Sequence, residues 1–354
     1  MLVGQPRANS KNARARTEHS KGSTFKYPLA KRAAYSATRA QIEALLRYGV
    51  LLAAICALWP AASAGAQSQE PDFASCAGRS NETTDVRIRS CTALINLSPQ
   101  LPQNLAIELF NRGSAYRDKG LYDLAIADFS QAIEHAPIYE PAYVNRGISY
   151  RDKGEYDLAV KDFDKAIELN PDDARAFSNR ANAYSDKGQY SRAISDYSEA
   201  IHRDPANWRV LVNRAVSYDA SGQIELAIGD YTGAINLHPD DADALNGRCF
   251  SLAEAGKLEL AILDCDRSLA LAPHTSATLD SRGFAYLKLG QYSRAIRDYD
   301  EALRLTPHLA TSLYGRGVAS LRLGDHRGDI DIQLAMTVDR SIATKMARLG
   351  ISPP

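Results

Sequence analysis

Seven arginines recur at one constant interval along this chain, and six aspartates recur at the same interval, each at a fixed separation after an arginine. The arginines are Arg112, Arg146, Arg180, Arg214, Arg248, Arg282 and Arg316. The aspartates are Asp128, Asp162, Asp196, Asp230, Asp264 and Asp298. Guanidinium and carboxylate groups can both bind ligands. Because the two rows share one period, however, an internal ion pair explains them better than ligand binding, and we predict a structural role for both.

The other chemically capable residues form no recognisable catalytic or metal-binding pattern. Histidines lie singly near expected helix ends or turns, without the spacing to Cys, Asp or Glu that a zinc site requires. These histidines are His135, His202, His238, His274, His308 and His326. The sequence also lacks a nucleophile elbow and a glycine-rich loop for phosphate. We therefore predict no enzyme, no metal site and no cofactor.

Each arginine belongs to a repeating unit, in which we number positions from the first residue. The units begin at Ala106, Glu140, Ala174, Trp208, Ala242, Ser276 and Ala310. The second unit divides into two helical stretches, 140–153 and 157–170, joined by Gly154 and Glu155 and followed by Pro171. Glycine suits the left-handed residue that closes a helix, and proline cannot continue one. The pattern predicts an all-α row of helical hairpins.

Three positions of the unit carry small residues, which close helix packing requires. Position 8 holds Gly113, Gly147, Ala181, Ala215, Cys249, Gly283 and Gly317. Position 20 holds Ala125, Ala159, Ala193, Ala227, Ala261, Ala295 and Asp329. Position 27 holds Ala132, Ala166, Ala200, Ala234, Ser268, Ala302 and Met336. Because Ser320, Gln333 and Asp329 depart from the pattern, we expect the core of the seventh unit to be broken, as in a terminal cap with a polar outer face.

These residues resemble the tetratricopeptide repeat (TPR) family, in the variant that reads N-R-G-x-A-Y-x-x-x-G-x-Y-x-x-A-I-x-D-F-x-x-A-I. The resemblance covers 106–336 and implies a right-handed α-solenoid. The repeats would be 106–139, 140–173, 174–207, 208–241, 242–275, 276–309 and 310–339. In 67–105 we expect an N-terminal cap, because 87–97 resembles the second helix of a repeat with Cys91 in the aromatic position. In 340–354 we expect a C-terminal capping helix, at 341–349, and a tail.

The resemblance also implies where a ligand binds. The first helices of such solenoids line a concave face, with ligand contacts near positions 2, 5, 6, 9, 12 and 13. Our candidate peptide-binding residues there are Phe110, Asn111, Val144, Asn145, Ile148, Asn179, Asn182, Val212, Asn213, Val216, Phe250, Phe284 and Tyr314. The asparagines could bond the backbone of an extended peptide. Alternatively, several candidates pack between neighbouring repeats. No three consecutive repeats supply the Lys, Asn and Arg set with which some TPR proteins grip a C-terminal carboxylate.

The segment 1–66 differs from the repeats. Ten Lys or Arg and only two acidic residues lie up to Arg47, followed by the apolar run 49–58 and by Ala64, Gly65 and Ala66. This order is typical of an export signal cleaved before Gln67, which predicts a periplasmic or secreted protein. The alternative is an uncleaved inner-membrane anchor at 49–66.

Export would change the charge of the protein. The whole chain has 42 basic and 42 acidic residues, so the part after the leader has 32 and 40, a net charge of −8. Such a charge provides no electrostatic attraction to nucleic acid, which we exclude as a partner. We predict a protein or peptide ligand instead, with membrane contact only if the leader is uncleaved.

Four cysteines would remain after cleavage, an even number that suits an oxidising compartment. Cys76 and Cys91 are the better disulfide candidates, because a bridge would pin a short N-terminal segment onto the following helix. Cys249 and Cys265 occupy opposing positions of one hairpin. They either form a second disulfide or remain reduced core residues, since packed helices often keep Cα atoms too far apart for a bond.

The sequence therefore predicts a non-enzymatic interaction scaffold or adaptor of the bacterial cell envelope. Its concave groove would bind a peptide or a segment of a partner protein. The alternative is a membrane-anchored structural tether of an envelope complex, in which the convex or lateral surface matters more than the groove.

Overall fold

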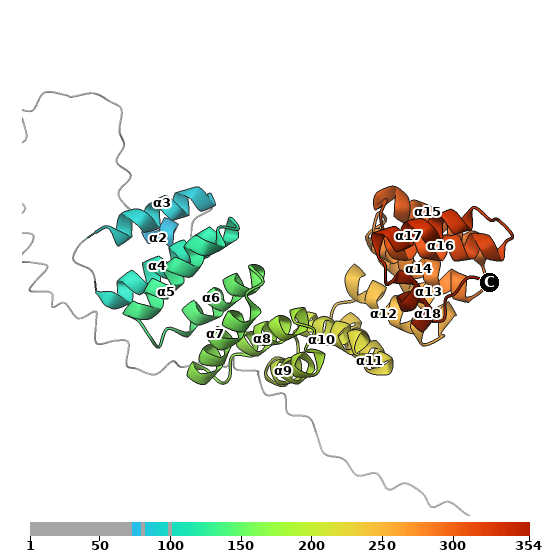
Figure 1. Cartoon of the computed structure of the whole chain (residues 1–354). Coiled ribbons are helices and arrows are strands. Elements are labelled where there is room, and N and C mark those ends of the chain that lie inside the picture. Colours follow the sequence, from blue (N-terminus) through green and yellow to red (C-terminus); the bar gives the residue numbers. More distant parts are fainter. Residues whose placement is uncertain (1–72, 79–81, 98–100) are drawn as a thin grey trace, which may run out of the picture. The chain divides into compact units, whose positions relative to one another are not determined.

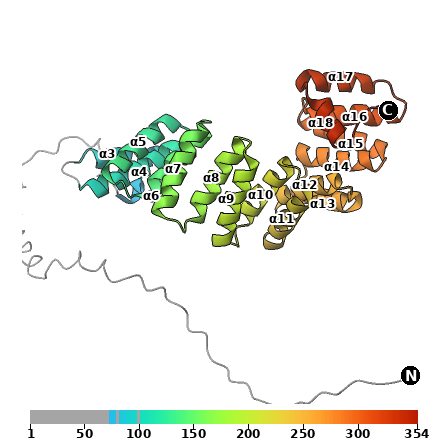
Figure 2. The same ribbon diagram turned by 60° about the horizontal axis from the view of Figure 1, so that its bottom comes forward.

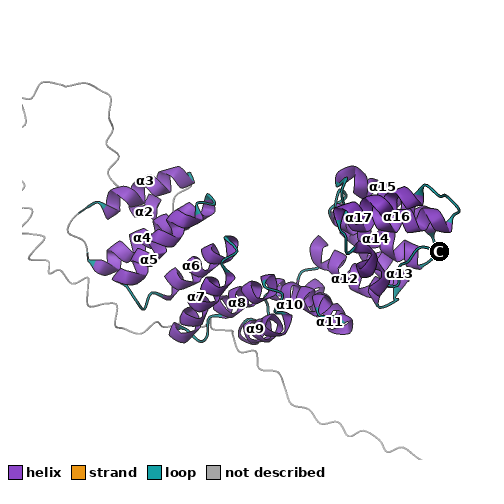
Figure 3. Ribbon diagram, in the orientation of Figure 1, coloured by secondary structure: helices purple, strands orange, loops and turns teal. Residues whose placement is uncertain are grey.

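A computed structural model describes residues 73–78, 82–97 and 101–354. Within these ranges the chain forms 17 helices, α2 to α18, and no strand (Figure 3). All of them belong to one compact unit, Gln69–Pro354. The predicted export signal, its cleavage site and the alternative anchor, all in 1–66, lie outside the described residues.

The seven predicted hairpins are present, and the chain is all-α as expected (Figure 1). The first helices are α4 Pro102–Asp118, α6 Glu140–Asp152, α8 Ala174–Asp186, α10 Trp208–Ala220, α12 Ala242–Glu254, α14 Ser276–Lys288 and α16 Ala310–Arg322. The second helices are α5 Tyr122–His135, α7 Tyr156–Leu169, α9 Tyr190–Arg203, α11 Ile224–Leu237, α13 Leu258–Leu271, α15 Tyr292–Leu305 and α17 Gly328–Val338. Each first helix ends as predicted: Gly154, for example, has a φ of 80°, which favours glycine.

Consecutive hairpins stack in a row (Figure 2). Each second helix packs against the first helix of its own hairpin and against the first helix of the next. Among the described helices, successive first helices from α4 to α16 also contact one another, whereas successive second helices do not. The first helices therefore lie on the inner side of the array and the second helices on its outer side.

Small buried residues hold the two helices of each hairpin together. The alanines at position 20 are completely buried in the first six repeats. Position 8 is equally tight: a Cβ added to Gly147 would lie 2.8 Å from the ring of Phe163. This close approach places the Cα atoms of Cys249 and Cys265 only 5.5 Å apart, within the range of a disulfide, and their sulfurs lie at 2.05 Å.

The predicted ion pairs are confirmed in the first six repeats. In each one, the arginine Nε and Nη2 atoms donate to both carboxylate oxygens of the aspartate 16 residues later, at 2.6–2.8 Å. The Nη1 atom of all seven arginines donates to the element before its hairpin, a contact that sequence reasoning missed. The acceptor is Thr92 of the N-terminal cap for the first arginine and position 25 of the preceding repeat for the other six. Those six acceptors are Ser130, Asp164, Ser198, Thr232, Asp266 and Asp300. Each arginine thus connects the helices of one hairpin and joins that hairpin to its predecessor.

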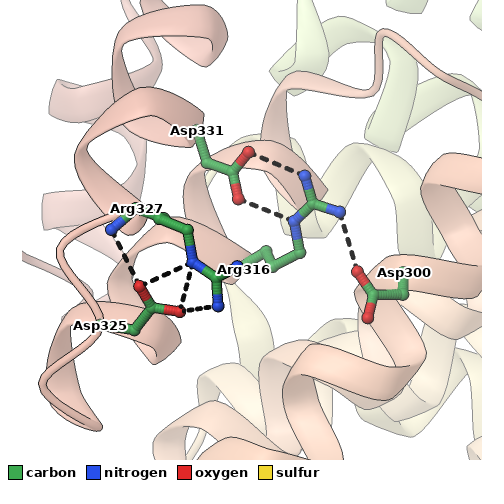
Figure 4. A network of polar contacts seen from close by, with 5 residues as sticks. All are labelled: Asp300, Arg316, Asp325, Arg327 and Asp331. Carbon is green, nitrogen blue, oxygen red and sulfur yellow. Dashed lines mark hydrogen bonds and ion pairs between the residues drawn. The ribbon is translucent and has the colours of Figure 1, made fainter.

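The expectation of a broken core in the seventh repeat is wrong. Arg316 pairs with an aspartate 15 residues later instead of 16, so the pattern of the second helix continues one residue early, although α17 itself begins only after the connection 323–327. Each recurring place of this helix is taken by the residue before the expected one. Gly328 replaces Asp329, Ile332 replaces Gln333 and Ala335 replaces Met336, and these three replacements are buried. Asp331 takes the place of the pairing aspartate, expected at position 23. Arg316 accordingly binds Asp331 at 2.7 Å and Asp300 at 2.8 Å, while Asp325 pairs with Arg327 nearby (Figure 4).

Short helices flank the repeats at both ends. At the N-terminal end, α2 Phe73–Cys76 and α3 Thr84–Ile95 pack together, and α3 packs on α4 as the second helix of a repeat would. The sulfurs of Cys76 and Cys91 lie 2.12 Å apart there. At the C-terminal end, α18 Ile342–Arg348 contacts α16 and α17, near the expected capping helix, and buries Ile342 and Met346.

Candidate functional site

The thirteen candidate residues all lie on first helices, but three of them are not on the surface. Val144, Phe284 and Tyr314 are buried and belong to hydrophobic clusters shared by neighbouring hairpins. For these three the prediction of a ligand contact is wrong, and the alternative of packing between repeats holds. Val144 and Tyr314 stand at position 5 and Phe284 at position 9. Each packs against apolar residues of an adjacent hairpin, and a large apolar side chain is drawn into that interface.

The other ten candidates retain access to solvent in varying degree. Phe110, Ile148, Val212 and Phe250 are half-buried and pack against the hydrophobic clusters. The half-buried asparagines are Asn111, Asn145, Asn179, Asn182 and Asn213. Val216 is the most open of all, with 49% of its surface exposed. An aliphatic side chain so exposed on the inner side of the array can contact a ligand without disturbing the fold.

A cavity of about 360 Å³ brings three of the candidates together. It opens among helices α6, α8, α9 and α10. Its lining consists of Arg151, Asn182, Ser185, Asp186, Tyr197, Asn213 and Val216. We call this cavity the inner pocket. Arg151 Nε lies 3.7 Å from an oxygen of Asp186, so the pocket presents both a cation and a carboxylate next to an apolar edge.

Hydrogen bonds fix the polar floor of the inner pocket. The Oδ1 atom of Asn182 accepts from the Tyr197 hydroxyl at 2.6 Å and from Asn213 Nδ2 at 3.2 Å. Burial and the nearby charge of Asp186 raise the pKa of Tyr197, so this hydroxyl stays protonated and keeps its role as a donor. The floor is therefore rigid and neutral, and it offers side-chain amides that suit the backbone of an extended peptide.

Sequence reasoning missed four residues of the inner pocket. Arg151, Ser185 and Asp186 stand at positions 12 and 13, where the family resemblance implied contacts in general, but we had selected only positions 5, 6 and 9. Tyr197 comes from a second helix, where an aromatic side chain indicates core packing. The signal that could have revealed it is tyrosine in place of phenylalanine, because a buried hydroxyl needs a partner.

A second hollow lies on the outer side, between α11 and α13. This outer groove has a volume of about 660 Å³. It is lined by Ile228, Thr232, Arg248, Leu252, Lys257, Leu260, Leu263, Asp264 and Arg267. Leu260 and Leu263 expose 55% and 59% of their surfaces, which makes the groove an apolar patch.

The outer groove lies where one side chain of the repeat pattern is replaced. In the neighbouring repeats the arginine of the ion pair lies under a tyrosine ring at position 11, as Arg214 does with Tyr218 at 5.7 Å. In the fifth repeat Leu252 replaces that tyrosine. The substitution by leucine was visible in the sequence, but the hollow is also lined by residues of α11 and α13, whose placement comes from the fold.

Two further findings concern membranes and metals. No helix in the described ranges is long and apolar enough to span a bilayer. Those ranges also contain no group of three His, Cys, Asp or Glu side chains arranged to hold a metal ion.

Comparison with known proteins agrees with the fold. A family model described as TPR repeat matches residues 147–186 and 283–324. Of two models described as tetratricopeptide repeat, one matches 106–139 and 174–207, and the other matches 212–274. Together these matches span more than half of the chain. No curated protein matches the chain in sequence.

Solved structures of low sequence identity share the architecture. A tetratricopeptide repeat protein from Parabacteroides merdae is 18% identical, with a TM-score of 0.57 over 70% of this chain and 99% of that one. A chain of the APC/C hetero-tetramer Cut9–Hcn1 is 18% identical, with a TM-score of 0.57 over 76% of this chain and 52% of that one. The type IV pilus biogenesis factor PilW is 17% identical, with a TM-score of 0.54 over 59% of this chain and 96% of that one. The repeat matches, the hairpins and these likenesses together show that the chain belongs to the tetratricopeptide repeat family.

Proposed function

We propose that this protein is an interaction scaffold whose inner surface binds a peptide or a segment of a partner protein, and that it acts by recognition rather than turnover. Tetratricopeptide repeats of this kind support protein–protein interaction. The single observation that carries the proposal is the inner pocket, where amides, a cation, a carboxylate and the exposed Val216 converge from three first helices.

The inner pocket has the properties of a recognition site. Its amides and charged groups can form hydrogen bonds that fix the register of a bound segment, and Val216 adds apolar contact area. Asn182 is held by Tyr197 and Asn213, so binding does not have to order the floor of the pocket first. Such preorganisation favours affinity because less conformational entropy is lost on binding.

Replacing Val216 with aspartate tests the proposal. We would select a peptide from a displayed library of random 12-residue segments on the full-length protein and measure its affinity by fluorescence anisotropy. Val216→Asp should weaken binding by at least about tenfold, because it places a charge at the apolar edge of the pocket. Leu226→Asp is the matched control, since Leu226 is 52% exposed but lies on the outer helix α11. Equal losses in both variants would contradict an inner binding surface.

The outer groove favours a second candidate function, that of a structural tether. An apolar hollow of about 660 Å³ with exposed leucines suits a partner that docks on the outer side of the array. In that case Leu263→Asp, and not Val216→Asp, would abolish binding of the selected peptide. The same set of variants therefore separates the two candidates.

We also propose that the protein resides in the bacterial cell envelope after cleavage before Gln67. The basic and apolar order of the leader supports this location, as do two cysteine pairs at bonding distance. The test is the intact mass of protein purified from its own cells, with and without reduction before alkylation. A chain that begins at Gln67 and gains four alkyl groups only after reduction is expected. A retained leader in a membrane fraction would favour the anchored tether.

A further inference from the structure

Tyrosine rings in other repeats show what stands at the place where the outer groove opens. Position 11 lies one helical turn after the arginine of each ion pair. In the first, fourth and sixth repeats the centre of the ring at this position lies 5.7–5.9 Å from the guanidinium carbon. The pairs are Arg112 with Tyr116, Arg214 with Tyr218, and Arg282 with Tyr286. Such contacts are favourable because the face of an aromatic ring is negative and the guanidinium is positive.

The sixth repeat shows the surroundings of this ring most fully. Tyr286 lies 5.9 Å from Arg282 and 5.6 Å from Arg294, which stands at position 19 on the second helix. In the fifth repeat the residues at positions 7, 11 and 19 are Arg248, Leu252 and Leu260. All three line the outer groove. The groove therefore keeps the guanidinium of this arrangement but lacks the ring.

The guanidinium of Arg248 is fixed in place without a ligand. Its Nε and Nη2 atoms donate to Asp264 at 2.6 and 2.8 Å, and its Nη1 atom donates to Thr232 at 3.1 Å. These bonds lie along the edges of the planar group, and they leave its faces for stacking. Among the described residues, no aromatic ring is stacked on Arg248.

Two leucines extend the apolar surface beside the place of the missing ring. Leu260 and Leu263 are 55% and 59% exposed and lie one helical turn apart on α13. The fifth is the only one of the first six repeats with leucine at position 22. The other five have Ala127, Lys161, Ser195, Gly229 and Arg297 there. An apolar surface longer than one ring suits a protein segment with several side chains better than a single small molecule.

The charges around the outer groove favour an electron-rich partner. Its lining contains three cations, Arg248, Lys257 and Arg267. Asp264 offsets the first, and Glu225 offsets the second at 2.8 Å. The groove keeps a net positive charge, which attracts the negative face of an aromatic ring and disfavours a cationic side chain.

We propose that the outer groove binds an aromatic side chain of a partner protein, stacked on the guanidinium of Arg248 and flanked by Leu260. A second apolar side chain of the same partner segment lies against Leu263. This inference rests on the second candidate function, docking on the outer side of the array, and adds the chemistry of the partner. Because the inner pocket lies on the other side, the two sites can be tested separately.

Saturation-transfer difference NMR on the full-length protein tests the stacking directly. The probe is the peptide acetyl-Ser-Phe-Ser-Ser-Leu amide, and the matched control peptide carries cyclohexylalanine in place of phenylalanine. The two side chains have similar size, but only phenylalanine has a negative face. Titrations should therefore show about threefold tighter binding of the phenylalanine peptide. Equal or tighter binding of the control peptide would overturn the stacking on Arg248.

A variant that supplies the missing ring locates the site. Leu252→Tyr restores the tyrosine of the repeat pattern, so its own ring should fill the groove and weaken binding of the phenylalanine peptide by at least about fivefold. Leu271→Tyr is the matched control, since Leu271 is 45% exposed on the same helix α13 as Leu260 but does not line the groove. It should preserve binding.

Leu260→Ser provides a second variant that does not depend on repacking. Because Leu260 is 55% exposed, the substitution leaves the core intact, and it should weaken binding by about threefold through loss of apolar contact. Far-ultraviolet circular dichroism would establish that all three variants retain the fold. Undiminished binding in both Leu252→Tyr and Leu260→Ser would contradict the site.

Two further comparisons identify the occupant. Benzyl alcohol offers the ring without a peptide, and it should bind more weakly than the phenylalanine peptide. Equal affinity would indicate a small aromatic molecule as the occupant and would overturn a partner protein. If a library peptide binds and depends on Leu263 but the phenylalanine peptide does not bind, docking on the outer side stands and the aromatic site fails. If the phenylalanine peptide binds at the groove but no library peptide binds, the aromatic site stands and the proposed recognition at the inner pocket fails.

Discussion

Replacing Arg146 with methionine is expected to lower the free energy of unfolding by about 3 kcal/mol. Arg146 donates to both oxygens of Asp162 at 2.8 and 2.7 Å, and Asp162 is buried. Without the guanidinium, the carboxylate remains inside the hairpin with no cation beside it. The third bond of Arg146, to Ser130 at 3.0 Å, is lost as well, so the contact with the preceding repeat weakens. Urea unfolding followed by circular dichroism measures the effect.

The loss should depend on pH, which distinguishes it from simple loss of packing. Burial raises the pKa of Asp162, and the hydrogen bond and charge of Arg146 oppose that rise. In Arg146→Met the folded-state pKa therefore rises further above the unfolded value. The penalty is complete above the folded pKa and disappears as the pH falls toward the unfolded value, so the variant should lose less stability at acidic pH than at neutral pH.

Two comparison variants complete this test. The double variant Arg146→Met with Asp162→Asn should recover most of the lost stability, because the buried charge is gone. Arg304→Met removes an arginine that is 61% exposed and pairs with Glu301, which is itself 39% exposed, so it should cost less than about 1 kcal/mol. A pH-independent loss in Arg146→Met, or no recovery in the double variant, would show that the pair does not act through its buried charge.

Replacing Gly315 with alanine should destabilise the protein by about 2 kcal/mol, because the added methyl group overpacks a closed interface. An added Cβ would lie 2.4 Å from the Cζ atom of Tyr299 and 2.5 Å from its hydroxyl oxygen. Tyr299 is almost completely buried, at 1% exposure, so its ring cannot swing into solvent. Overpacking of this kind costs about 3 kcal/mol, and the better helix propensity of alanine returns about 1 kcal/mol.

Gly229 provides the matched control, because a Cβ added there meets nothing within 4 Å. Gly229→Ala should stabilise α11 by about 0.5–1 kcal/mol. Thermal unfolding followed by circular dichroism should therefore shift in opposite directions for the two alanine variants. A Gly315→Ala protein as stable as Gly229→Ala would mean that Tyr299 does not pack against α16 as described.

The features that repeat with one period could be predicted from the sequence. The hairpins, their closing glycines and the first six arginine–aspartate pairs each depend on residue types that recur at fixed spacing. The register of the last hairpin could not, because there the pairing aspartate follows its arginine by 15 residues instead of 16, so Asp331 takes the place of an aspartate that seemed to be absent. The contact of Arg316 with Asp331 and the burial of Ile332 and Ala335 reveal the shift.

The candidate site was less predictable because exposure depends on neighbouring repeats. Val144 and Val216 have the same side chain and lie on equivalent helices, yet they are 6% and 49% exposed. Position in the repeat does not decide this, because Val318 stands at position 9 as Val216 does and is only 2% exposed. The outer groove was still harder to foresee, since its lining comes from helices α11, α12 and α13 of two hairpins.

The measurement that tests the central claim most directly is site-specific photo-cross-linking of a library-selected peptide. The photoreactive residue p-benzoylphenylalanine would replace Val216 on the inner side in one protein and Leu226 on the outer side in another. Recognition at the inner pocket predicts a covalent adduct from position 216 that excess unlabelled peptide suppresses, and none from position 226. Adducts from position 226 alone would contradict binding on the inner surface.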